Sequence, residues 1–224
     1  MSARRAPRPA LCKVPMSNIQ LHKHDLPAGL GFGPLVAIDT ETMGLDPRRD
    51  RLCLVQLSSG DGTAHLVQII PTHLGGQGAN CPNLKALLAD TAVTKLFHFA
   101  RFDIAAMLNG LGVLTTPVIC TKIASKLVRT YTDRHGLKDL CRDLAGVEIS
   151  KQQQTSDWGA LDLTPEQLTY AASDVLYLHK IWSRLEALLL REGRMDIARA
   201  AYTFLPTLAK LDLLGYADPD LFHH

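Results

Sequence analysis

Short apolar runs in the first half of the chain, separated by clusters of Gly, Pro, Asn, Asp and Ser, predict a series of β-strands. The predicted strands cover residues 35–39, 52–58, 63–70, 95–99 and 118–120. The second and third runs are joined by Ser59-Gly60-Asp61-Gly62, a sequence that favours a tight hairpin turn. We therefore expect the first three strands to pair in an antiparallel arrangement.

Apolar residues spaced three and four apart predict helices in the second half of the chain. Thr164, Pro165 and Gln167 fit an N-cap, a first helical position and a capping box. The helix that begins there continues to Leu185. Other helices are predicted over 84–89, 102–111, 121–131, 137–144 and 195–214, the last with a kink before Pro206. This order of elements indicates an α/β fold, a mixed sheet flanked by helices.

The length of 224 residues suits one sizeable α/β domain. Residues 1–16 are rich in Arg, Ala and Pro and contain no acid, so we interpret them as a disordered basic tail. Residues 17–224 are then the single folded domain. Beyond the tail, 20 basic residues face 22 acidic ones, a net charge of −2.

The small net charge of residues 17–224 bears on which substrates the protein can bind. A protein that follows a long phosphate backbone usually carries a basic stripe, because each neutralised phosphate adds to binding. Near neutrality favours a substrate with few phosphates. Assembly of several copies could still gather basic residues into one channel.

The five cysteines are odd in number and form no CxxC pair, which argues against a zinc site and a disulfide framework. They predict a reducing compartment, the cytoplasm. No run of about 18 apolar residues is present, so no membrane span is expected.

Two carboxylates follow the apolar run of residues 35–38. Asp39 and Glu41 are one residue apart, so in a strand both side chains point to the same face. Buried carboxylates repel one another unless a cation or hydrogen bonds compensate. The pair is therefore a candidate site for a hard cation, and an acidic pair at a surface strand end is the alternative.

A second group of candidate residues lies on the helix that begins at Pro165. Tyr170 and Asp174 are four residues apart, so a phenol and a carboxylate share one helix face. Asp103 follows the apolar run 96–99, at a loop or helix start. The alternatives are a helix N-cap for Asp103 and simple ring packing for Tyr170.

The order DxE, FD and YxxxD resembles the DEDD exonucleases that have tyrosine in the last motif, the branch that includes ribonuclease D. The similarity covers roughly residues 20–220. Four stretches resemble the nanoRNase C group, short relatives of ribonuclease D that act on dinucleotides. These stretches are RLCLVQLSSGDGTAHL, CTKIASKLVRTYTDRHGLKDL, KQQQTSDW and YAASDVLYLHKI.

The resemblance implies a ribonuclease H-like fold without the helical HRDC domain, and a 3′-5′ exoribonuclease that converts dinucleotides to mononucleotides. Asp39, Glu41, Asp103 and Asp174 would hold two divalent cations, Mg²⁺ or Mn²⁺, and Tyr170 would position the attacking water. It also implies a homo-oligomer such as a ring of eight. The alternatives are a general ribonuclease D-like exonuclease on longer RNA or DNA, and a catalytically silent nucleic-acid-binding module.

Further residues are expected to contact the substrate. In the resembling proteins a leucine four residues after the motif glutamate acts as a wedge between two bases, and Leu45 matches that offset; a staple to the core is the alternative. A 5′-phosphate cap is assigned to Arg129, Tyr131, Lys151 and Gln154, with a solvated helix end and a polar loop as the alternative.

Three residues beside the motif carboxylates complete the predicted contacts. They are Thr40, His98 and Phe102, and His98 could equally be a core histidine. One departure from the family pattern lies nearby. Relatives of ribonuclease D often show His-Asn-Ala before the phenylalanine-aspartate pair, whereas this chain has Phe99 at the asparagine position. Any substrate contact made by that amide is absent here.

Overall fold

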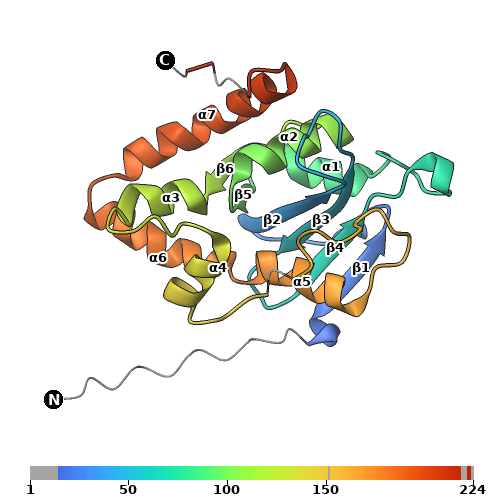
Figure 1. The fold of residues 1–224 in the computed structure, drawn as a ribbon, viewed down its shortest axis with the longest axis horizontal. Helices are drawn as coiled ribbons and strands as arrows, with labels where there is room; N and C mark the ends of the chain where they lie inside the picture. The colour runs from blue at the N-terminus through green and yellow to red at the C-terminus, as the bar shows by residue number, and fades with distance from the viewer. Residues whose placement is uncertain (1–14, 151, 218–220, 223–224) are drawn as a thin grey trace.

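The structure is a computed structural model that describes residues 15–150, 152–217 and 221–222. Its centre is one six-stranded sheet with the order β1-β4-β3-β2-β5-β6 (Figure 1). The strands are β1 (Ile19–Lys23), β2 (Leu35–Thr42), β3 (Leu52–Ser58), β4 (Ala64–Gln68), β5 (Thr94–Phe97) and β6 (Val118–Cys120). The predicted basic tail lies almost entirely outside the described residues.

The sheet is mixed. β2, β3 and β4 pair antiparallel, as predicted, and Gly60 and Gly62 both adopt positive φ in the turn between β3 and β4. β5 and β6 add to β2 in parallel, and β1 adds to β4 in parallel on the other side. β1 was not predicted, because it is only five residues long and its partner is more than 40 residues away.

Helices follow the strands in the predicted order. They are α1 (Pro82–Ala89), α2 (Ala100–Leu111), α3 (Thr121–Val128), α4 (Leu137–Leu140), α5 (Pro165–Leu176), α6 (Leu178–Arg191) and α7 (Met195–Leu213), with 3₁₀ turns η1 (Met16–Asn18) and η2 (Thr72–Leu74) and a π-helical turn η3 (Cys141–Ala145). The single helix predicted from Pro165 is in fact two, divided at Tyr177. α7 continues through Pro206. Among the described residues, no helix combines the length and apolar character needed to cross a membrane.

β3 is buried along all seven residues, because helices cover both faces of the sheet. α5 packs across β2, β3 and β4, and α2 contacts β2 and β5. β5 pairs with β2 only at Leu35–Ala37, so the rest of β2 continues past the end of its parallel neighbour. In α/β sheets this position, beyond the carboxyl end of a parallel strand, is a usual place for a binding site.

The start of α5 is fixed by local chemistry. The Gln167 backbone N–H donates to the Thr164 hydroxyl at 3.2 Å, and the Thr164 N–H donates to the Gln167 side chain at 2.9 Å, so the predicted capping box is confirmed. The Gln167 amide also donates to Ser156 and to the carbonyl of Asp157. The helix that carries Tyr170 and Asp174 is thereby tied to the preceding loop.

Candidate active site

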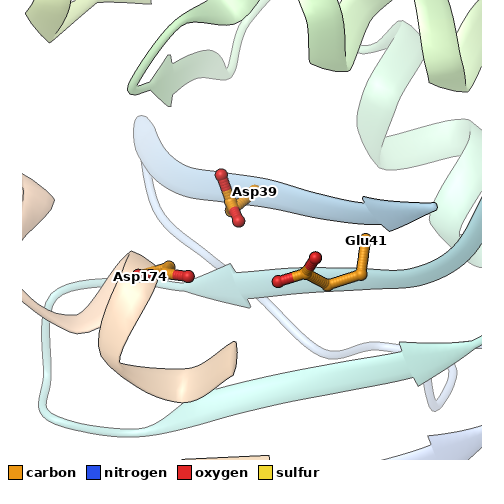
Figure 2. A group of neighbouring side chains, drawn as sticks. All are labelled: Asp39, Glu41 and Asp174. Atoms are coloured by element: carbon orange, nitrogen blue, oxygen red, sulfur yellow. The ribbon is translucent and has the colours of Figure 1, made fainter. Parts of the chain in front are cut away.

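Three carboxylates from two elements meet above the sheet. Asp39 and Glu41 project from one face of β2, and Asp174 projects toward them from α5 (Figure 2). One oxygen from each side chain lies within 4.8 Å of the others. This spacing fits oxygen ligands that share a divalent cation.

Burial is the main reason why the proton affinity of these carboxylates is raised. Burial raises the pKa of Asp39 to about 7, although a hydrogen bond from the Thr40 backbone opposes the shift. Burial, followed by the negative charges of Asp39, Asp174 and Asp103, raises the pKa of Glu41 to about 10. A bound divalent cation would supply the positive charge that this group lacks, so the residues present fit such an ion.

Asp103 approaches the group from the opposite face of β2. It lies in the first turn of α2, where its carboxylate accepts a hydrogen bond of 2.7 Å from the Thr40 hydroxyl. Thr40 stands between Asp39 and Glu41, so its side chain points away from theirs. Burial and the charge of Asp39 raise the pKa of Asp103. The N-cap of α2 is Phe99, so the alternative of Asp103 as a helix cap is wrong.

Tyr170 faces the same group from α5. Its phenol hydrogen-bonds Asp174, and burial together with the neighbouring carboxylates raises the pKa of Tyr170 above its ordinary value. Tyr170 is therefore a neutral phenol that donates to a carboxylate. The ring of Trp158 packs against it, with 5.9 Å between the ring centroids.

A cavity of about 560 Å³ opens in front of the carboxylates, within the size range of small-ligand sites. Its walls include all four carboxylates, Tyr170 and the predicted contacts Thr40, Leu45, His98, Phe102 and Gln154. Leu45 and Phe99 also line it and are 87% and 48% exposed, so the cavity has an apolar rim.

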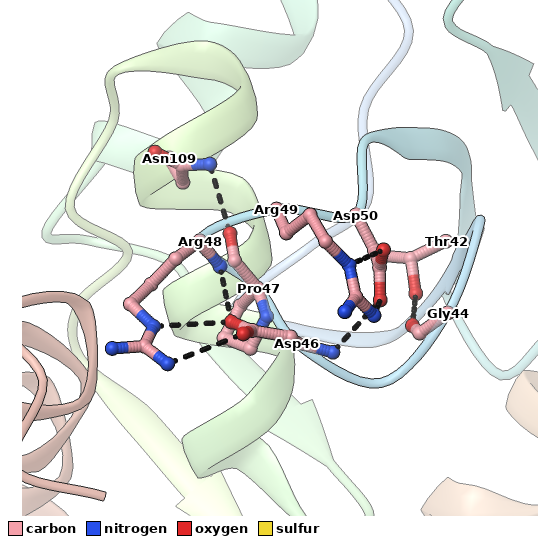
Figure 3. A network of polar contacts seen from close by, with 8 residues as sticks. All are labelled: Thr42, Gly44, Asp46, Pro47, Arg48, Arg49, Asp50 and Asn109. Atoms are coloured by element: carbon pink, nitrogen blue, oxygen red, sulfur yellow. Dashed lines mark hydrogen bonds and ion pairs between the residues drawn. The ribbon is translucent and has the colours of Figure 1, made fainter.

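The loop that carries Leu45 is braced by polar contacts (Figure 3). The carboxylate of Asp50 accepts from the Asp46 backbone N–H at 3.0 Å and from the guanidinium of Arg49. The Asn109 amide on α2 donates to the Pro47 carbonyl at 2.8 Å. At Gly44, an added Cβ would lie 2.2 Å from an Asp50 oxygen, so any other residue would displace the Asp50 carboxylate. The exposed leucine is thus held on a preorganised turn.

His98 and Phe99 lie in the short connection between β5 and α2. The Thr121 hydroxyl donates to the Phe97 carbonyl, so the 2.9 Å contact with His98 makes His98 Nδ1 the donor. Phe99 has φ 75°, a left-handed conformation that asparagine tolerates and phenylalanine rarely adopts. The Lys122 ammonium lies 4.1 Å from the centre of its ring.

The predicted phosphate cap is not assembled as expected within this chain. Arg129 is buried, pairs with Asp143 at 2.5 Å and donates to the Arg134 carbonyl, so its guanidinium braces the 129–143 segment. Tyr131 is 79% exposed beside Arg129, and neither residue lines the cavity. Of the four cap residues, Gln154 does line it, and Lys151 lies outside the described residues.

Several residues of the cavity wall were not predicted. Lys122 and Lys138 are cationic residues that line the same cavity as the four carboxylates, and the ring of Trp158 packs against Tyr170. Each lysine resembles any solvated helix residue in the sequence. Only the packing of α3 and α4 beside the sheet reveals that they share the cavity.

Comparisons with known proteins agree with this arrangement. Residues 22–190 match the family model described as 3′-5′ exonuclease. Ribonuclease D of Acidiphilium cryptum is 39% identical over 167 residues, which are 75% of this chain and 41% of that protein. The chain thus spans about two fifths of the length of the curated relatives it matches.

Solved structures extend the likeness to the fold. Brucella melitensis NrnC is 55% identical with a TM-score of 0.87, covering 93% of this chain and 99% of that one. Structures of that NrnC with bound Mg²⁺ and bound pGG also match. Escherichia coli RNase D is 28% identical with a TM-score of 0.68, covering 79% of this chain and 45% of that one. The predicted ribonuclease H-like class is confirmed, and the chain belongs to the 3′-5′ exonuclease family.

Proposed function

We propose that this protein is a 3′-5′ exoribonuclease that hydrolyses RNA dinucleotides to mononucleotides. The observation that carries the proposal is the group of Asp39, Glu41 and Asp174 within 4.8 Å, set beside Tyr170 in a cavity of about 560 Å³. The preference for dinucleotides is supported by the near-complete overlap with Brucella NrnC, which binds pGG.

Asp39, Glu41, Asp103 and Asp174 would hold two divalent cations, Mg²⁺ or Mn²⁺. Four carboxylates offer the hard oxygen ligands that both ions prefer. When bound, such ions supply the Lewis acidity that activates water and stabilises the leaving 3′ oxygen. The raised pKa values of Asp39 and Glu41 are the mark of a site short of positive charge.

The protein's own groups would orient the reactants. Tyr170, a neutral phenol fixed by Asp174 and Trp158, would hold the attacking water in line with the phosphorus. Lys122 and Lys138 would meet the phosphates of the substrate across the cavity. Leu45 would insert between the two bases, a contact that tolerates any base sequence because each base has an apolar face.

We further propose that the protein is cytoplasmic and forms a homo-oligomer, such as a ring of eight. Cys53, Cys81, Cys120 and Cys141 are free thiols, which suits a reducing compartment. Ile197 and Phe204 on α7 are 61% and 40% exposed and seven residues apart, so they give one helix face an apolar surface that a second copy could cover.

The substrate proposal is tested with purified protein, Mg²⁺ or Mn²⁺, and 5′-labelled RNAs of two, three, five and twenty nucleotides. We expect rapid loss of the dinucleotide and little change in the longer chains, because the cavity would close around two nucleotides. Asp39→Ala serves as the blank. Equal rates at every length would favour a general ribonuclease D-like exonuclease, and no cleavage would favour a silent binding module.

Tyr170→Phe removes only the phenol oxygen. If the hydroxyl orients water, kcat should fall on the order of 100-fold while KM for the dinucleotide stays within about twofold. Steady-state kinetics measures both constants. The matched control is Tyr202→Phe, a buried tyrosine that does not line the cavity. An unchanged kcat in Tyr170→Phe would remove the phenol from the mechanism.

Leu45→Ala shortens the side chain at the cavity rim. Loss of contacts with two base faces, worth about 1–3 kcal/mol per base, should raise KM for the dinucleotide at least about tenfold with little change in kcat. Leu74→Ala, an exposed leucine on η2 outside the cavity, is the control. Similar KM values for both variants would argue for Leu45 as a mere packing residue.

The assembly is tested by size-exclusion chromatography with light scattering at several protein concentrations. We expect a mass of eight chains. Ile197→Glu with Phe204→Glu should reduce it, because charges on the apolar face of α7 would oppose contact between copies. A wild-type protein that elutes as a monomer at every concentration would contradict the proposed oligomer.

A further inference from the structure

Gln56 on β3 is a polar side chain buried without an evident reason. Its exposed fraction is 0%, and neither its amide nitrogen nor its amide oxygen has a hydrogen-bond partner among the described residues. A buried amide without partners is costly, and an apolar residue of the same size would avoid that cost. Unlike Ser58, the other buried polar residue of β3, Gln56 makes no hydrogen bond with its side chain, which suggests a partner that is present only in another state of the site.

The register of the sheet places Gln56 next to the carboxylates. In the antiparallel pair of β2 and β3, Gln56 is directly opposite Asp39. Side chains at opposite positions point to the same face, with Cβ atoms about 4.5–5.5 Å apart. The Gln56 amide therefore lies on the face that Asp39, Glu41 and Asp174 share beneath α5.

The chemistry of the two side chains is complementary. The Gln56 Nε2 group has two N–H donors, and a carboxylate that binds a cation through one oxygen keeps acceptor capacity on the other. The Thr40 backbone already donates a hydrogen bond to the Asp39 carboxylate, and this bond opposes the rise in pKa that burial causes. A second donor would fix the plane of the carboxylate and thereby its orientation toward a bound ion.

We propose that Gln56 is a positioning residue of the cation site, donating from Nε2 to the Asp39 carboxylate when that carboxylate holds a divalent cation. The inference rests on the cation site of the proposed function. It assigns Gln56 no contact with substrate. Its effect is on the affinity of the protein for the ion, by holding a ligand in the orientation that binds.

The test is calorimetric titration of Mn²⁺ into the full-length wild-type protein and into Gln56→Leu, a change that keeps the volume and removes the amide. Loss of such a supporting hydrogen bond should weaken Mn²⁺ binding about 10- to 100-fold. Without Mn²⁺, Gln56→Leu should melt at the same temperature as wild type or higher, because an unpartnered buried amide has been removed. A purely structural role would instead lower the melting temperature and leave the affinity unchanged.

Three further variants distinguish failure of the proposed role of Gln56 from failure of the cation site itself. Tyr202→Phe removes another buried polar atom that lacks a partner and should bind Mn²⁺ like wild type. Gln56→Met gives a second apolar replacement if leucine does not fold, and wild-type affinity in a folded Gln56 variant overturns the inference. Asp39→Ala should lose binding. If it binds as wild type does, or if wild type itself does not bind, the cation site and the role of Gln56 both fail.

Discussion

Concentrated negative charge in a buried place is the constraint that the rest of this structure depends on. The two-residue repeat of a strand puts Asp39 and Glu41 on one face of β2, and helix α5 brings Asp174 to the same point. Burial raises the proton affinity of Asp39 and Glu41, and the neighbouring negative charges raise that of Glu41 further, so the group either takes up protons or needs a cation. A bound divalent cation would supply the positive charge that protons on these carboxylates otherwise supply. The site is thus a binding site because its own electrostatics are unfavourable without a ligand.

Such a group persists only where the surrounding structure fixes it, and three different devices do so here. β2 is held by β3 along its length while continuing past β5, which leaves its carboxylates accessible. The capping box of Thr164 and Gln167 sets the start of α5 and ties it to the preceding loop. Asp50 braces the turn that presents Leu45. Catalytic geometry is therefore carried by ladder hydrogen bonds, a helix cap and a turn network, all of which are satisfied without a ligand.

The features that sequence predicted well are those decided within a few residues. The capping box, the Gly-rich hairpin turn and the one-residue spacing of Asp39 and Glu41 depend on local backbone geometry alone. The features it missed depend on distant partners. Arg129 resembles a free cation until folding places Asp143 against it, and Lys122 gains its position at the cavity only through packing of α3. The break at Tyr177 was hidden because apolar spacing continues across it from α5 into α6.

Phe99 departs from the family pattern, and its backbone and its side chain both affect the site. Its left-handed backbone begins α2, and Asp103 lies one turn further on, so the conformation of Phe99 helps to set the position of a carboxylate. Asparagine would adopt this conformation with less strain, on the order of 1–3 kcal/mol for a residue held in a sparsely populated region. Phenylalanine instead gives the cavity an apolar wall that Lys122 covers, and the same ring also lines the adjoining cavity of about 320 Å³ next to Leu45. Because the strain and the apolar wall come from one residue, relieving the first would remove the second.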